Sequence, residues 1–185
     1  MEVCSAQGYH ATRMEDIAAA AHVSKGSLYY HFRTKQDLFI ELIEEFLSAE
    51  RQRLKVKLAT GMPARHTLRE AFYEGFKQAD SMPGLMRGMV DFYLLAVREA
   101  EFRKRFDGYY DEWVSLCAEV IRRGIASGEF SASLDPDATG WTLVTALDGV
   151  MLTHIMLNHQ ERSVETAALC LRLLLAGMQA KETEQ

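Results

Sequence analysis

The chain has 185 residues, of which 48% are hydrophobic and 25% charged, a balance that is typical of a folded globular protein and excludes a disordered one. The formal net charge of −5 excludes a uniformly basic nucleic-acid-binding protein but allows a local DNA-binding element. Three widely spaced cysteines, Cys4, Cys117 and Cys170, form no CxxC or Cys/His group. We therefore expect no disulfide framework, no zinc site and a reducing, cytoplasmic environment.

Helical periodicity runs through almost the whole sequence, and long alternations of apolar and polar residues are nearly absent, which predicts an all-α fold. No charged-then-apolar secretion signal opens the chain. The most membrane-like stretch, residues 138–157, contains one charged residue, Asp148, together with four threonines and His154. This composition favours a buried helix of a water-soluble protein over a membrane-spanning helix, so we expect no membrane partner.

The N-terminal part of the chain is predicted to form short helices that lead into a long one. In chain order these are the end of a helix over residues 1–6, stopped by Gly8, a short helix beginning at Thr12, a second over residues 25–32, and a long helix from Lys35 into the fifties. Thr12 and Glu15 have the spacing of a capping box, and so do Thr34 and Asp37. Both pairs predict the starts of helices.

The rest of the chain is predicted to form five further helices. They cover residues 64–80, 85–105, 110–125, 136–158 and 164–178. Residues 85–105 are apolar nearly all round as far as Val97, which is typical of a central helix, and we expect the chain to bend or stop near Asp107 and Gly108. Asp135 before Pro136 is an N-cap followed by a first-turn proline. Ser163 is expected to cap the last helix, and residues 181–185 to fray.

The two short helices are joined by Ala21-His22-Val23-Ser24, which is the spacing of a helix-turn-helix, a motif whose second helix enters the DNA major groove. The preceding alanines are small enough for two helices to cross closely. We expect Val23, Leu28 and Phe32 to face inward and fix the crossing angle.

The side chains left outward on the second helix have the chemistry for DNA. Lys25 supplies a cation, Gly26 lets the backbone approach closely, and Tyr29, Tyr30 and His31 can hydrogen-bond phosphate oxygens. The N-terminus of the helix that begins at Thr12 also suits a phosphate. The predicted DNA-binding residues are Thr12, Arg13, Ser24, Lys25, Gly26, Ser27, Tyr29, Tyr30, His31 and Lys35.

This stretch resembles the DNA-binding signature of the tetracycline-repressor (TetR) family of bacterial transcriptional regulators. The matching residues are Gly8-Tyr9, Thr12, Asp16-Ile17-Ala18, Val23-Ser24-Lys25-Gly26, Leu28-Tyr29, His31-Phe32, Lys35 and Leu38. The resemblance implies a homodimer, an all-helical C-terminal domain, a double-stranded operator and a small-molecule effector that weakens DNA binding. It makes repression the default.

The sequence departs from the family in two places. The family has about a dozen more residues before the position of Met1, so we expect a first helix that is cut to a stub. His22 stands where the family turn usually has glycine, and histidine tolerates positive φ better than most residues. With these departures, we expect a helix-turn-helix domain over residues 1–40 and a ligand-binding and dimerisation domain over residues 41–185.

Aromatic and methionine side chains crowd the middle of the chain, and methionine suits an adaptable pocket. We expect a subset of them to line an apolar cavity for a hydrophobic or aromatic ligand, with the acidic balance favouring a cation. The predicted lining residues are Phe72, Tyr73, Phe76, Met86, Met89, Phe92, Tyr93, Trp113, Cys117, Leu147, Met151 and His154. His154 also fits a satisfied core histidine, and Asp148 needs a partner if it is buried, either at a polar cavity end or at a dimer seam.

The helices over residues 110–125 and 136–156 carry apolar stripes and small residues, so two from each subunit are predicted to form a four-helix dimer seam. The small residues are Ala118, Gly124, Ala138, Gly140, Ala146 and Gly149. The sequence has no nucleophile elbow, HExxH motif or phosphate loop, and we expect neither enzyme activity nor a cofactor or metal. The alternative function is a helical ligand-binding module that has lost DNA binding, because the first helix is short and the N-terminal charge only weakly basic.

Overall fold

The structure is a computed structural model that describes residues 12–159 and 162–179. Within these residues the chain forms helices alone, apart from a single bridge between Phe130 and Gln179, so the all-α prediction is confirmed. The helices are α2 (Met14–Ala20), α3 (Lys25–His31), α4 (Lys35–Ala59), α5 (Ala64–Asp80), α6 (Pro83–Arg98), α7 (Ala100–Ala126), α8 (Pro136–Leu157) and α9 (Ser163–Gly177). The expectations for residues 1–6, Gly8 and residues 181–185 fall outside the described residues.

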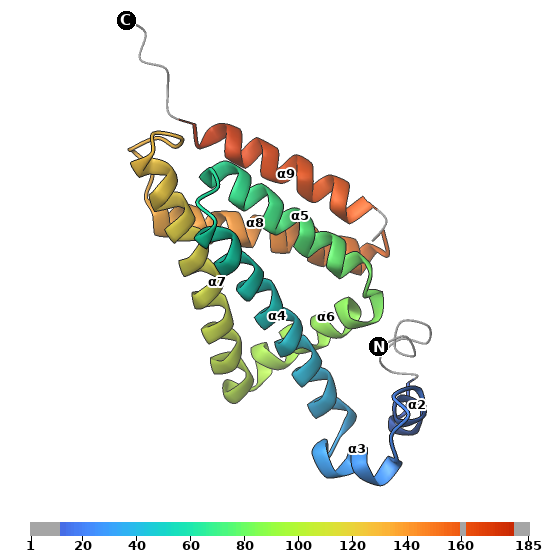
Figure 1. Ribbon diagram of the computed structural model, residues 1–185. Helices are drawn as coiled ribbons and strands as arrows, with labels where there is room; N and C mark the ends of the chain where they lie inside the picture. Colours follow the sequence, from blue (N-terminus) through green and yellow to red (C-terminus); the bar gives the residue numbers. More distant parts are fainter. Residues whose placement is uncertain (1–11, 160–161, 180–185) are drawn as a thin grey trace, which may run out of the picture.

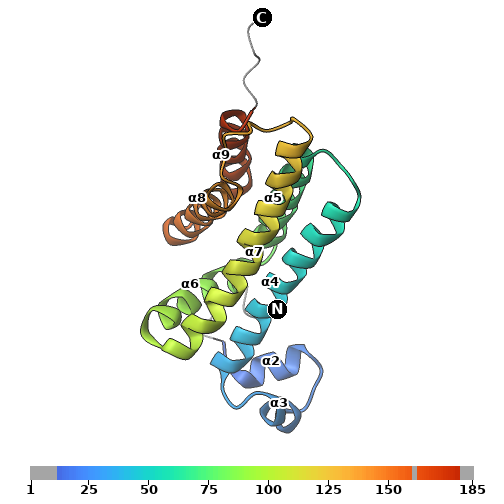
Figure 2. The same ribbon diagram turned by 90° about the vertical axis from the view of Figure 1, so that its left-hand side faces the viewer.

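The short helices α2 and α3 lie at one end of the long helix α4, away from α5, α8 and α9 at the other end (Figures 1 and 2). Helix α7 runs alongside α4 and continues to the same far end as α5. Helix α4 is therefore the element that connects the two ends of the molecule.

Three hydrophobic clusters hold this arrangement together. The largest joins α5, α7, α8 and α9, with Leu54 from α4. The second joins α4 and α6 around Ile43 and Phe92. The third joins α2, α3 and the start of α4 around Leu28 and Leu38. Leu42 of α4 packs against the second and third clusters alike, so α4 is shared by the small N-terminal core and the body.

The predicted capping of α4 and α8 is confirmed. The Asp37 backbone N–H donates to Thr34 Oγ1 at 3.1 Å, and the Thr34 N–H donates to Asp37 Oδ2 at 2.9 Å. At α8, Asp135 Oδ1 accepts from the backbone N–H groups of Asp137 and Ala138 at 2.9 and 3.2 Å. Side chains thus satisfy orphan donors at both helix starts.

Two other predicted caps are wrong. Helix α2 is capped at Arg13, whose N–H donates to Asp16 Oδ2 at 3.0 Å. Thr12 is instead buried, at 1% exposure, and precedes the N-cap residue. At α9 the N-cap is Arg162, and Ser163 is already the first helical residue, with no side-chain cap bond at this start.

The expected helix over residues 85–105 is two helices that meet at Glu99, whose backbone is extended (φ −123°, ψ 120°). The Arg103 guanidinium donates to the carbonyls of Ala96 and Val97 at 3.1 and 2.8 Å, so it satisfies acceptors at the end of α6. The predicted stop near Asp107 is wrong, because α7 continues through Gly108 to Ala126. The break depends on this fold-back contact and not on a helix-breaking residue.

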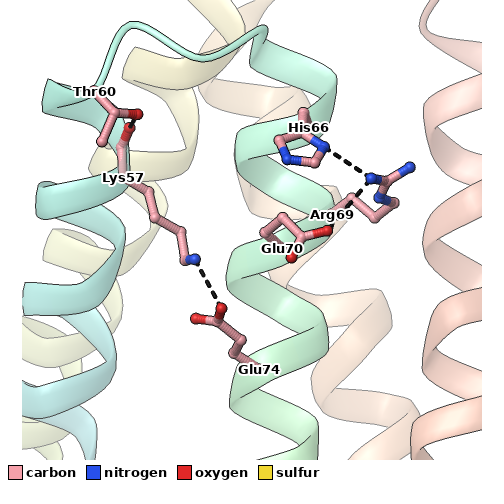
Figure 3. Close-up of polar contacts among 6 residues, drawn as sticks. All are labelled: Lys57, Thr60, His66, Arg69, Glu70 and Glu74. Atoms are coloured by element: carbon pink, nitrogen blue, oxygen red, sulfur yellow. Dashed lines mark hydrogen bonds and ion pairs between the residues drawn. The ribbon is translucent and has the colours of Figure 1, made fainter.

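Long-range polar contacts secure the joint between α4 and α5. The Arg123 guanidinium of α7 donates to the carbonyls of Leu58 and Met62, both at 2.7 Å. Glu129 accepts from the first two backbone N–H groups of α5, those of Ala64 and Arg65, at 2.9 and 3.1 Å. Lys57 of α4 also pairs with Glu74 of α5 at 2.9 Å (Figure 3). These contacts hold the C-terminal half of α4 against α5.

The predicted dimer seam is wrong for residues 110–125, because this part of α7 buries its apolar residues inside the chain. Gly140 of α8 lies on the α7 backbone, where an added Cβ would be 3.1 Å from the Val114 carbonyl oxygen and 3.2 Å from the Ala118 nitrogen. Close helix packing within one chain therefore uses these small residues.

The exposed apolar surface at this end of the molecule belongs to α8 and α9. It includes Trp141, Met156, Leu157, Leu169 and Leu173, which are 46–70% exposed. By length and composition, α8 is the one helix in the described parts of the chain that is suited to cross a membrane, and only 22% of its apolar window is buried. The expected buried helix is therefore buried on one face only, which includes Leu143 and Leu147, while the other face is open.

Candidate DNA-binding and ligand-binding sites

The turn between α2 and α3 has the backbone that a helix-turn-helix needs. His22 has φ 55°, as expected of a histidine in the usual glycine position. Ser24 is the N-cap of α3, and its Oγ accepts from the Ser27 N–H at 3.0 Å. Leu28 is buried and Phe32 partly buried, as predicted, whereas Val23 is 43% exposed. Leu28 therefore anchors α3 without help from Val23.

The outward face of α3 is polar and aromatic. Tyr30 is 87% exposed and Tyr29 is 41% exposed. Ser24, Lys25, Gly26, Ser27 and His31 are exposed as well. Helix α3, which carries these residues, lies at one tip of the molecule (Figure 2). Such a surface offers hydrogen-bond donors and little bulk, which suits the edges and phosphates of a duplex groove.

The Lys25 ammonium is engaged within the motif. It lies 2.5 Å from Glu15 Oε1 of α2 and 5.7 Å from the centre of the Tyr29 ring. The hydrogen bond and the charge of Glu15 raise the pKa of Lys25, so Lys25 is a cation at neutral pH. The pair links α2 to the start of α3 and keeps the cation at the end of α3 predicted to meet bases.

The remaining predicted DNA-binding residues lie around the start of α2. Arg13 is exposed, whereas the Thr12 side chain is buried. The partly buried Lys35 donates from Nζ to the Thr12 carbonyl oxygen at 2.9 Å. The start of α2 and the start of α4 are thereby tied together, and Arg13 is the residue of these three whose side chain is open to solvent.

A cavity lies in the body, between α4, α5, α6, α7 and α8. Its wall is almost entirely apolar. The lining residues are Phe46, Leu47, Glu50, Arg51, Ala71, Phe72, Gly75, Phe76, Ala79, Met89, Tyr93, Phe106, Tyr109, Tyr110, Trp113, Val144, Leu147, Asp148 and Met151. A concave, mostly apolar space with a few polar groups is the usual form of a small-molecule site.

The cavity brings together seven of the predicted lining residues, namely Phe72, Phe76, Met89, Tyr93, Trp113, Leu147 and Met151. The others lie elsewhere. Met86, Phe92 and Cys117 are in the packed core, and Tyr73 lines a separate groove between α5 and α9. His154 bridges α8 and α9, with Nδ1 2.8 Å from the Val150 carbonyl oxygen and Nε2 3.2 Å from Thr166 Oγ1, as expected of a satisfied histidine.

The prediction missed the contribution of α4, which supplies Phe46, Leu47, Glu50 and Arg51. These residues recur at spacings of three and four, so they share one helix face. The charges of Glu50 and Arg51 made that face look solvent-exposed in the sequence. Two charged residues beside Phe46 and Leu47 are, however, a signal for a polar patch in an apolar wall. The same reason explains why Tyr109 and Tyr110 in the charged first half of α7 were missed.

The charged groups of the cavity fall at two places. On the α4 side, Glu50 pairs with Arg53, and Arg51 pairs with Glu112 at 3.2 Å. On the α8 side, Asp148 accepts a hydrogen bond from the Tyr110 hydroxyl. Burial raises the pKa of Asp148 to about 6, although this hydrogen bond lowers it. No ion pair in the described part of the chain involves Asp148, so its charge is compensated by a neutral group only.

Comparison with known proteins covers nearly the whole chain. Residues 1–42 match the family described as "Bacterial regulatory proteins, tetR family". Residues 64–179, more than half of the chain, match the family "BetI-type transcriptional repressor, C-terminal". The two matches follow the division into a helix-turn-helix end and a helical body.

Individual relatives are similar along most of their length. The fatty acid metabolism regulator protein of Bacillus subtilis is 23% identical over 98% of this chain and 92% of its own. Transcriptional regulator AcuR of Cereibacter sphaeroides is 28% identical over 82% of this chain and 71% of its own. The crystal structure of the transcriptional regulator FadR from Bacillus subtilis in complex with stearoyl-CoA has a TM-score of 0.75 at 23% identity. That likeness covers 96% of this chain and 95% of FadR, and it shows a shared fold.

Proposed function

This chain belongs to the TetR family of bacterial transcriptional regulators, and on that premise we propose that it is a ligand-responsive repressor released from a palindromic operator by a small hydrophobic or aromatic molecule. The observation that carries the proposal is that one helix, α4, joins an outward polar α3 to a cavity with an apolar wall. We assign residues 1–40 to DNA binding and 41–185 to ligand binding and dimerisation. The proposed role is cytoplasmic and involves no catalysis.

In this proposal α3 enters the major groove. Lys25, Gly26 and Ser27 in its first turn meet base edges, and Tyr29, Tyr30 and His31 contact phosphates. Arg13 and Lys35 contribute phosphate contacts from the starts of α2 and α4. Support comes from the exposure of Tyr30 and of the first turn of α3. Lys25 exchanges Glu15 for a base or a phosphate when DNA binds.

We propose that the dimer forms through α8 and α9, in place of the seam expected from residues 110–125. The exposed apolar side chains of Leu173, Leu169 and Met156 support this assignment, since a contiguous exposed apolar face marks an interaction surface. Two-fold symmetry then places two α3 helices on successive turns of one face of the duplex, about 34–36 Å apart.

The proposed coupling runs through α4. Phe46, Leu47 and Glu50 touch the cavity, and Leu38, nine residues before Leu47, belongs to the core that supports α3. A ligand that pushes α4 outward at Phe46 moves the base of α3. Release requires that the ligand bind the displaced state more tightly than the DNA-bound state.

The direct test is fluorescence anisotropy with a labelled DNA fragment from upstream of the protein's own gene. We expect saturable binding whose affinity falls as the salt concentration rises. We also expect weaker binding to a fragment of scrambled sequence at the same salt concentration. Salt-insensitive binding, or no binding to any part of that region, overturns the proposal. It would favour the alternative, a helical ligand-binding module without DNA-binding activity.

A further inference from the structure

Asp148 lies where the internal cavity meets an outer groove. It lines both spaces, together with Tyr93, Phe106 and Tyr110. The groove opens between α7 and the exposed face of α8. The Tyr110 hydroxyl donates to Asp148, so two hydrogen-bonded residues line the cavity and the groove alike.

The groove is acidic. Asp107 and Asp111 of α7 line it with Asp148, and its lining includes no lysine, arginine or histidine. Asp107 and Asp111 are exposed, whereas Asp148 is partly buried. A channel with one sign of charge and apolar walls concentrates ions of the opposite sign, so the approach to the cavity from this side favours a cation.

Aromatic rings continue from the cavity to the groove around Asp148. The Phe106 ring centre lies 5.1 Å from that of Tyr93 and 5.3 Å from that of Tyr110. Tyr110 in turn lies 5.4 Å from Trp141. The faces of such rings attract organic ammonium groups. The rings therefore offer a cation an apolar route that ends at a carboxylate.

We propose that the effector is an organic cation whose ammonium group pairs with Asp148 while its apolar body occupies the cavity. This inference rests on the proposed function, in which the cavity is the effector site. The charges on the α4 side of the cavity are already paired, Glu50 with Arg53 and Arg51 with Glu112. Asp148 is the one carboxylate of the cavity lining that has a neutral partner.

An anion is the competing occupant, and stearoyl-CoA is the ligand of the related FadR. Arg51 offers it a buried Nη1 that has no hydrogen-bond partner among the described residues. The three aspartates at the groove oppose the phosphates of such a ligand. A partly buried carboxylate with a neutral partner also carries a free-energy cost that a cation reduces and an anion increases.

The test uses three probes of similar shape: 4-phenylbutylamine as the cation, 4-phenylbutanol as the neutral form and 4-phenylbutyrate as the anion. Isothermal titration calorimetry with the full chain at about pH 7.5 gives a Kd for each probe. We expect the amine to bind at least about tenfold more tightly than the alcohol, a difference of about 1.4 kcal/mol, and the anion to bind most weakly. Equal or tighter binding of the alcohol or the anion overturns the inference, as does no binding of the amine.

Two variants distinguish a specific role of the Asp148 carboxylate from the effect of the protein's net negative charge. Asp148→Asn is expected to raise the Kd of the amine at least about tenfold and that of the alcohol less than about threefold. Asp80→Asn removes one exposed charge at the end of α5 and is expected to leave the Kd of the amine unchanged. Unchanged amine binding by Asp148→Asn overturns the inference.

If Asp148→Asn does not fold, the paired variant Asp107→Asn and Asp111→Asn tests the same idea at exposed positions. It is expected to raise the Kd of the amine severalfold, more so at low salt, and an unchanged Kd counts against the inference. DNA binding by the unmodified chain without probe is measured on the same preparation. Retained operator binding with a wrong ligand order rejects the cation and leaves the repressor function standing.

Discussion

The Asp148 carboxylate carries a charge whose energetic cost depends on pH. Burial raises the pKa of Asp148 to about 6, above the value of about 3.9 for aspartate in an unfolded chain. Its titratable neighbours Tyr93, Tyr110 and Cys117 have pKa values raised by burial, so they stay neutral below pH 8. No charged group of α6 or α7 pairs with it in the described chain. Asp107 and Asp111 of α7 line the same groove as Asp148, and like charge there also favours the protonated form of Asp148.

Because the folded protein holds this proton more tightly than the unfolded chain, the contribution of Asp148 to stability falls as pH rises from about 4 to about 6. We predict that Asp148→Asn is more stable than the parent at pH 8, by roughly 1–3 kcal/mol. The difference should vanish near pH 4. Urea unfolding at both pH values measures it, and a constant difference would contradict the raised pKa.

The α3 surface gives a second prediction at the scale of single residues. Lys25→Ala and Tyr29→Phe remove groups exposed at the predicted groove-facing surface, so each should weaken operator binding by about 1–3 kcal/mol without changing helix content. Glu15→Gln frees Lys25 from its ion pair and removes a negative charge near the DNA, so it should strengthen binding. Anisotropy titrations compare the three, and unaltered affinity in all of them would remove α3 from the DNA contact.

At the scale of the elements, the N-terminus of α5 is capped by a side chain that lies more than sixty residues further along the chain. Its N-cap residue, Pro63, makes no side-chain cap bond, and Glu129 accepts from Ala64 and Arg65 instead. Burial by itself would raise the pKa of Glu129, but these two backbone hydrogen bonds, a hydrogen bond from Ser127 and the charge of Arg123 together lower it. The cap therefore operates at neutral pH and weakens as pH falls through that lowered pKa.

We predict that Glu129→Ala lowers the free energy of unfolding by about 1–2 kcal/mol at pH 7, as expected for a lost charged cap. Glu119→Ala removes an exposed carboxylate of α7 and serves as the control, with a change below about 0.5 kcal/mol. Chemical denaturation of both variants gives the comparison. Equal effects would show that Glu129 acts as an ordinary surface residue.

The sequence predicted these elements well where the signals were local. The capping boxes and the proline after Asp135 lie next to the helices they start, so α4 and α8 begin as expected. The break at Glu99 and the cap of α5 involve contacts that form only in the folded chain. These are the hydrogen bonds from Arg103 to the end of α6 and from the start of α5 to Glu129. Such contacts cannot be predicted from short stretches of sequence.

At the scale of the whole molecule, the sequence predicted part of the cavity lining and missed the rest, because the lining comes from helices far apart in the chain. Aromatic and methionine residues of α5, α6 and α7 pointed to it, while the face of α4 was masked by its charges. Residues 110–125 were placed in the dimer seam because an apolar stripe in a sequence does not tell whether it faces its own core or a second chain. In the structure the apolar residues of the second half of α7 are covered by the same chain, whereas α8 and α9 each expose apolar side chains.

The open face leads to a prediction about assembly. Leu173 is 64% exposed on α9, so Leu173→Glu should leave the fold intact and shift the protein from dimer to monomer at micromolar concentration. Operator affinity should fall with it. Val56→Glu places the same charge at a residue of α4 that is 56% exposed and should stay dimeric. Sedimentation velocity distinguishes these outcomes, and a monomeric parent would reject the scheme.

The sharing of Leu42 between two hydrophobic clusters has a thermal consequence. The small core under α3 contains few buried side chains, too few for independent stability. It is therefore stabilised by the body through helix α4, which both share. Differential scanning calorimetry should record one endotherm in place of two, and Leu28→Ala should move that single peak to lower temperature. Warming would then abolish operator recognition and effector capture together, and two resolved peaks would contradict this cooperativity.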